Sequence, residues 1–250
     1  SDLNPIVMAG SNPVRILTLT GSNTGANKLA APIPDPTPAA NGVTYLTKSG
    51  AGTWEISGAS TYTGPTTINQ GTLRVTGSIA GTSGLTVHAG ATFEAAASQR
   101  LNGLTINAGG LVTLSAGAAK LLTVNSQPQL LSTATLDVNI SALAINYTGA
   151  TPLGTVRTQI MAARNGGTWN GSGIITSETS AASPSILTTL GVALADDIGK
   201  VGSTFGGQTV ASGDVLVMYT YGGDANLDGR INGDDYFAID SHVNVSGMSG

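Results

Sequence analysis

The chain has 250 residues, of which 10% are charged, 40% are hydrophobic and 35 are glycine. This low charge content and abundant glycine disfavour a helical protein, and the hydrophobic content disfavours disorder, so the composition predicts an all-β fold. A net charge of −4 argues against a nucleic-acid partner, and the lack of cysteine excludes disulfide scaffolds, thiol nucleophiles and thiolate metal sites. No apolar stretch approaches the ~20 residues of a membrane helix, so we expect no membrane insertion.

The first part of the chain predicts a strand followed by a proline-rich loop. Residues 14–20, VRILTLT, have the apolar and β-branched composition of a strand. Residues 31–41, APIPDPTPAAN, contain four prolines, and proline lacks the backbone donor that a sheet needs. We therefore expect residues 31–41 to be a loop that protrudes from the fold, or an exposed linker.

Residues 46–78 carry a pattern with a known counterpart. They read LTKSGAGTWEISGASTYTG and then PTTINQGTLRVTGS, and the flank at 16–30 reads ILTLTGSNTGANKLA. Over residues 16–78 the chain resembles the autotransporter-associated β-strand repeat of large bacterial surface proteins, although Gly64-Pro65 replaces the Gly-Gly or Gly-Ala that is usual there. The resemblance implies a right-handed β-helix that serves as a stalk or passenger outside bacteria and has no catalytic residues.

An internal repeat runs through the next part of the chain. TINQGTLRV at 67–75, TVHAGATFE at 86–94 and TINAGGLVT at 105–113 are displaced from one another by 19 residues, and TVN follows at 123–125. A period of about 19 residues suits one coil of a β-solenoid, in which two or three short strands are joined by tight corners. An antiparallel sandwich stays open as the alternative, because such a repeat could also be one hairpin.

Equivalent positions of the repeat predict how the coils stack. An aliphatic side chain follows the first threonine of each unit, and these side chains would form one apolar column: Ile68, Val87, Ile106 and Val124. A glycine stands four residues after that threonine in the first three units, where a corner with positive φ costs glycine little: Gly71, Gly90 and Gly109.

Further along the chain the repeat fades but the strand pattern continues. Residues 136–147 and 214–221 read as strands, and 157–165, RTQIMAARN, is the one plausible short helix. An open solenoid end exposes strand edges and apolar faces. We therefore expect residues 136–222 to be a β-rich continuation that caps the solenoid of residues 1–135.

The C-terminal part contains a candidate calcium-binding loop. Residues 224–235, DANLDGRINGDD, match the twelve-residue EF-hand loop, with Gly229 at the position where the loop turns sharply. Alternate residues of such a loop point inward, so their oxygen atoms can converge on a hard cation. The predicted Ca²⁺ ligands are Asp224, Asn226, Asp228, Arg230 through its backbone carbonyl, Asn232 and Asp235.

The same segment resembles a second family. GDANLDGRINGDDYFAIDSH, at residues 223–242, is similar to the dockerin type I repeat, in which a calcium loop precedes a helix. The resemblance implies a helix at 234–242 with docking residues Tyr236, Phe237 and Ile239, and binding to a cohesin-like partner. A dockerin has two such loops and this sequence has one, so the loop could instead be a structural clasp that orders the tail.

A carbohydrate-active β-helix would need catalytic carboxylates on neighbouring coils, and this chain offers few. Glu55 and Glu94 are the acidic residues between positions 36 and 136, and two coils would put them roughly 10 Å apart. We interpret them as isolated surface charges. His88 and His242 lie far apart in the sequence, so neither indicates a histidine-based site. We therefore predict that the protein is not an enzyme.

Together these patterns predict an extracellular structural protein at a bacterial surface: a stalk, an adhesin or a self-assembling fibre subunit. We expect a right-handed β-solenoid at residues 1–135, its cap at 136–222 and a calcium-binding tail at 223–250. Exposed coil ends favour head-to-tail self-association into filaments, for example through residues 14–20. A dockerin-type module with a cohesin-like partner is the alternative, a surface polysaccharide is a further candidate partner, and a carbohydrate-active β-helix is the least favoured hypothesis.

Overall fold

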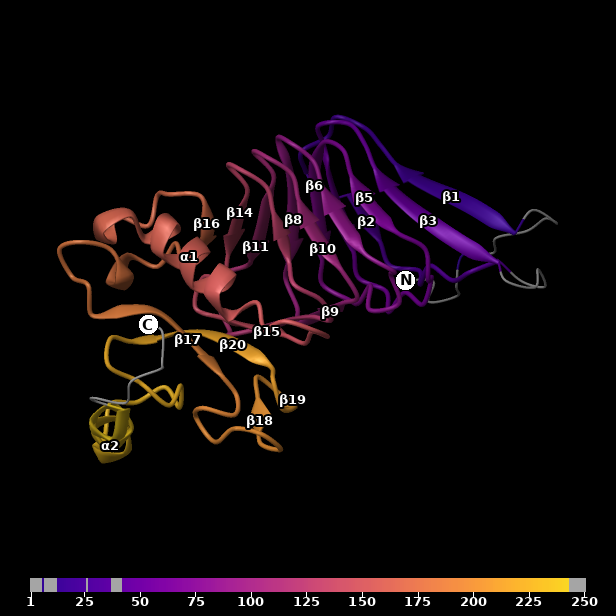
Figure 1. Ribbon diagram of the computed structural model, residues 1–250. Helices are drawn as coiled ribbons and strands as arrows, with labels where there is room; N and C mark the ends of the chain where they lie inside the picture. Colours follow the sequence, from indigo (N-terminus) through magenta and orange to yellow (C-terminus); the bar gives the residue numbers. More distant parts are fainter. Residues whose placement is uncertain (1–5, 7–12, 26, 37–41, 243–250) are drawn as a thin grey trace.

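The computed structural model describes residue 6 and residues 13–25, 27–36 and 42–242. Within them the chain forms a parallel β-solenoid of about five turns, followed by a C-terminal region that carries two helices (Figure 1). Successive turns add strands to the same parallel sheets. The predicted all-β solenoid is therefore confirmed, and an antiparallel sandwich is excluded for the repeat region.

Three sheets form the sides of the solenoid and part of its cap. The first sheet contains, in spatial order, β1 (Val14–Leu19), β3 (Val43–Lys48), β5 (Thr66–Ile68), β7 (Leu85–Val87), β10 (Leu104–Ile106) and β13 (Gln129–Leu130). The second contains β2 (Asn27–Leu29), β4 (Thr53–Ile56), β6 (Gly71–Val75), β8 (Ala91–Ala95), β11 (Leu111–Leu114), β14 (Thr135–Asp137) and β16 (Gly173–Ile175). The third contains β9 (Gln99–Leu101), β12 (Leu121–Val124), β15 (Ala142–Ile145), β20 (Val215–Tyr221) and β17 (Thr188–Leu194).

Stacked aliphatic side chains form the core beneath the first sheet. Ile68 pairs in register with Val87, Val87 pairs with Ile106, and all three side chains are fully buried. Each buried aliphatic side chain stabilises the fold by roughly 1.5–3 kcal/mol. The predicted column is confirmed for these three residues, and the register extends it with Leu19, Lys48 and Leu130.

Val124 does not belong to this column, so the prediction for that residue is wrong. It lies in β12, where it pairs with Leu101 of β9 and Ile145 of β15 in the third sheet. Leu130 takes the corresponding place in the first sheet, next to Ile106. From β9 onward a turn includes a strand of the third sheet, which places the last echo of the repeat on another side of the solenoid.

Glycine forms corners of the solenoid at the predicted positions. The φ angles of Gly71, Gly90 and Gly109 are 68°, 70° and 76°, a left-handed region that residues with a Cβ rarely adopt. At Gly71 the coils also stack closely, because an added Cβ would lie 2.4 Å from the carbonyl oxygen of Gly52. The corner prediction is therefore confirmed.

The proline-rich segment packs into the solenoid rather than protruding from it. Ile33 is fully buried, and its carbonyl oxygen accepts a hydrogen bond of 2.9 Å from the backbone N–H of Thr61 in the next turn. The expected protrusion is therefore wrong for residues 31–36, because this segment supplies the third side of its turn without being a strand. Residues 37–41 lie outside the described residues.

A helix covers the end of the solenoid. The helix α1 (Leu153–Arg164) packs against β16 and β17, and it buries Leu153, Val156, Ile160 and Ala163 (Figure 1). It contains most of the predicted helix at 157–165, but it begins at Leu153 and ends where Asn165 adopts a left-handed φ of 40°. The helix thus shields the strand edge and apolar face that the last turn would otherwise expose.

The C-terminal region returns to the third sheet before it forms the second helix. The strands β17 and β20 pair with each other antiparallel, and β20 pairs antiparallel with β15 of the solenoid. A short hairpin, β18 (Thr204–Phe205) and β19 (Gln208–Thr209), connects them. The helix α2 (Gly233–His242) follows the acidic loop, close to the predicted helix at 234–242. Neither described helix is long and apolar enough to cross a membrane.

Candidate functional site

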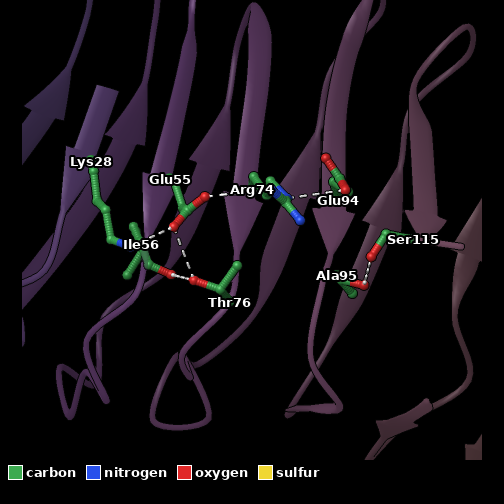
Figure 2. Close-up of polar contacts among 8 residues, drawn as sticks. All are labelled: Lys28, Glu55, Ile56, Arg74, Thr76, Glu94, Ala95 and Ser115. Carbon is green, nitrogen blue, oxygen red and sulfur yellow. Dashed lines mark hydrogen bonds and ion pairs between the residues drawn. The ribbon is translucent and has the colours of Figure 1, made fainter. Parts of the chain in front are cut away.

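A ladder of alternating charges lies on the outer face of the second sheet. Lys28, Glu55, Arg74 and Glu94 occupy one register position on the four neighbouring strands β2, β4, β6 and β8 (Figure 2). The Lys28 Nζ lies 3.2 Å from Glu55, the Arg74 Nη1 lies 3.4 Å from Glu55, and the Arg74 Nε lies 3.1 Å from Glu94. Each glutamate thus has at least one cation beside it, so the four residues form one continuous set of ion pairs.

This ladder corrects the interpretation of Glu55 and Glu94 as isolated surface charges. Arg74 bridges the two carboxylates, and the hydroxyl of Thr76 donates a further hydrogen bond of 3.3 Å to Glu55 (Figure 2). The residue Glu55 is only 9% exposed, so its charge needs these partners. An inverting pair of carboxylates leaves room for a water molecule between them, whereas a guanidinium group lies between these two. The geometry therefore gives the glutamates a structural role.

A column of threonines lies on the outer face of the first sheet. This column resembles the charged ladder of the second sheet, but its side chains carry hydroxyl groups instead of charges. The register aligns one threonine from each of five neighbouring strands: Thr18, Thr47, Thr67, Thr86 and Thr105. Thr18 is exposed and the other four are half-buried. Strands of one sheet lie about 4.8 Å apart, so this face presents hydroxyl groups at a regular spacing along the solenoid.

One lysine is buried inside the solenoid, where its hydrogen-bond acceptors among the described residues are backbone carbonyl oxygens rather than carboxylates. Lys48 is fully buried, and its Nζ donates hydrogen bonds to the carbonyl oxygens of Ser49, Gly50 and Gln70 at 3.2, 2.7 and 2.9 Å. Burial lowers the pKa of the Lys48 ammonium group below its ordinary value. The three carbonyl oxygens belong to corners of two successive turns, so Lys48 ties these turns together.

Two buried aspartates organise the acidic loop between β20 and α2. The Asp224 carboxylate accepts hydrogen bonds of 3.0 and 2.9 Å from the backbone N–H groups of Asp228 and Gly229, and it also contacts the Thr220 hydroxyl. The residue is 6% exposed. Asp224 therefore holds the sharp turn at Gly229, whose φ is 85°.

The fully buried Asp235 joins the beginning of the loop to its end. Its Oδ1 accepts hydrogen bonds from the N–H groups of Ala225 and Asn226 at 2.8 and 3.2 Å, and its Oδ2 accepts one from Asn232 at 2.8 Å. Burial by itself raises the pKa of Asp235, but the hydrogen bonds from Asn232, Asn226 and Ala225 outweigh it, so the pKa is lowered. The carboxylate is therefore held in its charged form.

The remaining predicted ligands lie around the same turn. The Asn226 side-chain oxygen accepts a hydrogen bond of 2.9 Å from the Asp228 N–H, and the Asp228 carboxylate accepts one of 2.9 Å from the Arg230 N–H. The Asn232 amide donates to the Asp228 carboxylate at 3.3 Å. The loop thus carries carboxylate and amide oxygens, which are atoms that suit calcium, and in this structure these oxygens accept hydrogen bonds from the loop itself. Within the described part of the chain, no three His, Cys, Asp or Glu side chains lie close enough together to hold a metal ion.

Comparison with known proteins places parts of two successive turns of the solenoid in a described repeat. Residues 46–75, from β3 to the end of β6, match the passenger-associated-transport-repeat family. A 70-residue stretch, 28% of this chain, is 43% identical to the adhesin BmaC autotransporter of Brucella suis biovar 1, of which it covers 2%. No solved structure matches the chain. The chain thus carries a passenger-associated transport repeat and is similar, over this stretch, to a small part of a bacterial surface adhesin.

Proposed function

We propose that this chain is a rigid passenger segment of an extracellular bacterial adhesin, in which the solenoid serves as a stalk. The observation that carries the proposal is the unbroken register of the first sheet, in which each turn repeats the position of the previous one from β1 to β10. Such stacking produces a rod in which every turn contacts its neighbours. The rod can be lengthened by further turns of the same structure. The transport repeat at residues 46–75 and the resemblance to an adhesin support a place outside the cell.

The charged ladder supports a mechanical rather than a catalytic role. Glu55 and Glu94 are the carboxylates that would have to act in a glycan-cleaving β-helix, and both are paired with Arg74, which lies on the turn between them. Their interactions run along the solenoid axis and join the turns from β2 to β8. Such a ladder resists separation of the turns, which is the load that a stalk carries.

Labelling of intact cells tests the proposed location. Antibodies raised against the folded chain should bind intact bacteria that produce the protein, and mild protease treatment of those cells should remove the signal. An antibody against a cytoplasmic protein serves as the matched control for cell integrity. Labelling that requires permeabilised cells would contradict the proposal.

A surface polysaccharide is the partner that we propose for the adhesin. The threonine column from Thr18 to Thr105 offers a flat face of hydroxyl groups, and Tyr45, 38% exposed, lies on the same face beside it. Hydroxyl groups and aromatic rings are suited to sugar hydroxyls and sugar rings. Binding of the chain to a glycan array should be lost on Thr67→Glu and kept on Thr72→Glu, which places the same charge on the second sheet. Equal binding by both variants would contradict the proposal that the threonine face binds the polysaccharide.

We further propose that the acidic loop binds calcium and so orders the C-terminal tail. The ligands would be Asp224, Asn226, Asp228, Asn232 and Asp235 with the Arg230 carbonyl, and calcium would supply a positive charge that cancels the repulsion between the carboxylates. Isothermal titration with CaCl₂ should give a binding isotherm that Asp224→Asn abolishes. Asp197→Asn removes an exposed carboxylate outside the loop and should leave the isotherm unchanged. If the unaltered chain gives no heat of binding, the calcium proposal is refuted, and the stalk proposal is unaffected.

A dockerin-type role is the second candidate function. The helix α2 directly follows the loop and exposes the aromatic residues Tyr236 and Phe237, as a docking helix would. A purified cohesin domain should then retain the chain on a column in the presence of calcium, and Asp228→Ala should prevent this. Passage of the unaltered chain through the column would remove this alternative.

A further inference from the structure

The outer face of the first sheet carries three parallel columns of residues, with the threonine column in the middle. Residues two positions apart in a strand share a face, so each threonine has an outward neighbour on either side. The column that precedes the threonines is largely apolar: Ile16, Tyr45, Pro65, Gly84 and Gly103. The column that follows them is polar: Ser49, Asn69, His88 and Asn107. No residue of the three columns is Asp, Glu, Lys or Arg, so this face suits an uncharged ligand.

The threonine hydroxyl groups are available to such a ligand. Four half-buried threonines form no side-chain hydrogen bond with any described residue: Thr47, Thr67, Thr86 and Thr105. In the polar column, by contrast, the Asn69 amide donates to the Ser49 hydroxyl at 3.5 Å, and the Asn107 amide lies 2.9 Å from His88 Nδ1. A hydroxyl group donates one hydrogen bond and accepts two. The middle column therefore offers unused donors and acceptors at each turn.

The two glycines of the apolar column are not required by the fold. The φ angles of Gly84 and Gly103 lie outside the left-handed region, and a Cβ added to either would meet no heavy atom closer than 3.8 Å. A Cβ at Gly64, by comparison, would lie 2.3 Å from the carbonyl oxygen of Thr44. Gly84 and Gly103 thus leave bare backbone beside the threonines of their strands, where a side chain could have been placed.

The other residues of this column continue the same uncharged surface along the solenoid axis. Ile16 is 66% exposed, and Tyr45 is 38% exposed. The Tyr45 ring packs against Gly64 of the next turn, where an added Cβ would lie 2.7 Å from its Cδ1. Pro65 follows, and then the two glycines. We call these five residues the apolar track: Ile16, Tyr45, Pro65, Gly84 and Gly103.

We propose that the polysaccharide bound by the threonine face is a neutral, linear glycan that lies along the solenoid axis. Its sugar rings would rest on the apolar track, and its hydroxyl groups would bond to the threonines, with about one sugar residue per turn. An extended chain of pyranose rings linked through equatorial oxygens at C1 and C4 advances at each residue by about the strand spacing of 4.8 Å, so successive residues can meet successive turns. This inference rests on the proposed polysaccharide binding and specifies the class of glycan.

The absence of charged side chains selects among linear glycans. A carboxylate or sulfate group on the sugar would lose part of its hydration on this face and would find no cation among the residues of the three columns. A glycan that coils would leave the face after one or two residues, because the threonines follow a nearly straight line. Neutral β-1,4-linked chains meet both conditions.

Oligosaccharides of defined length test the inference. Dissociation constants are measured by titration for β-1,4-linked oligomers of glucose, mannose, xylose and N-acetylglucosamine, each from two to eight residues long. Malto-oligosaccharides serve as the coiled control, and β-1,4-linked oligomannuronate serves as the charged control. The double variant Gly84→Val/Gly103→Val fills the track, and Thr72→Val places the same side chain on the second sheet. Circular dichroism checks that both variants are folded, as the open space at the two glycines predicts.

The expected result is a dependence on chain length that the track imposes. In at least one neutral β-1,4-linked series the dissociation constant should fall with each added residue and level off at about five residues, because the track has five positions. The double variant should raise the dissociation constant of the pentamer about tenfold or more, whereas Thr72→Val should leave it unchanged. Both control oligosaccharides should bind about tenfold more weakly or worse than that pentamer.

The outcomes separate this inference from the polysaccharide proposal. Affinity that does not depend on length, equal binding of the coiled or charged series, or an unaffected double variant would each overturn the inference. Glycan-array binding that Thr67→Glu removes would still support the threonine face in those cases. If no neutral series binds and the array is also negative, both the inference and the polysaccharide proposal are refuted.

Discussion

Two corner glycines allow the stacking of the turns to be measured with one pair of substitutions. Gly71 and Gly90 have nearly the same φ, 68° and 70°, so an alanine at either position pays a similar conformational cost of roughly 1–2 kcal/mol. Their surroundings differ. A Cβ at Gly71 would lie 2.4 Å from the Gly52 oxygen and 2.5 Å from the Gly50 oxygen, whereas a Cβ at Gly90 would have no heavy atom within 4 Å.

We therefore expect Gly71→Ala to destabilise the solenoid more than Gly90→Ala. Overpacking adds about 1–3 kcal/mol, which gives a total loss of roughly 2–5 kcal/mol for Gly71→Ala and roughly 1–2 kcal/mol for Gly90→Ala. Urea unfolding followed by far-ultraviolet circular dichroism measures both values. Equal losses at the two positions would refute the close stacking of the turn at Gly71 on the preceding turn.

Three further substitutions test the polar groups of the structure. Arg74→Met should lower the free energy of unfolding by about 1–2 kcal/mol in urea at low salt, and by less in 1 M NaCl, because Glu55 and Glu94 lose a partly exposed partner; a loss independent of salt would contradict the ladder. Lys48→Met should lower it by about 1–3 kcal/mol, since three carbonyl oxygens lose a charged donor while the cost of burying that charge disappears; an unchanged urea midpoint would contradict this role. Asp235→Asn, with a chelator present, should speed amide exchange at Ala225 and Asn232 at pH 7, and the difference should vanish as the pH falls well below 4: the folded-state pKa of Asp235 is lowered, so its stabilisation exists above the unfolded pKa and is lost as the carboxylate becomes protonated. A difference that persists at pH 2 would contradict this assignment.

The sequence was most informative where stacking imposes an identical spacing. Ile68, Val87 and Ile106 could be aligned because three successive turns have the same length and the same corner glycine. Parallel register then places equivalent side chains above one another, so the repeat itself predicts both the fold and the column. The helix around residues 157–165 could be predicted for a different reason, since its composition contrasts with the β-rich sequence around it.

The charged ladder escaped prediction because its members are unevenly spaced. Glu55 and Arg74 are 19 residues apart, Arg74 and Glu94 are 20 apart, and Lys28 precedes Glu55 by 27. The proline-rich segment lies between Lys28 and Glu55 and lengthens that turn, so a fixed period of 19 residues cannot align Lys28 with Glu55. A search that allowed the turn length to vary would have paired Arg74 with both glutamates.

Two errors in the solenoid arise because its turns are not built alike. The prolines of residues 31–41 predict a protruding loop because proline is unsuited to a strand, but the side of a turn without a strand can still bury an aliphatic residue such as Ile33. The local sequence around Val124 repeats that around Ile106 and so predicts the same column, but the turn that begins with β9 contains a third side, and Val124 pairs with β9 there. Local similarity identifies a strand, but turn length determines which sheet receives it.

Distances between spin labels on the threonine column test the stacked solenoid most directly. The chain has no cysteine, so a label at Thr18→Cys can be combined in turn with one at Thr67→Cys, Thr86→Cys or Thr105→Cys. The register places these residues two, three and four strands from Thr18, so dipolar electron paramagnetic resonance should give backbone separations of about 10, 14 and 19 Å, with one strand spacing added at each step. Separations that do not increase in equal steps would contradict the stacking of the turns.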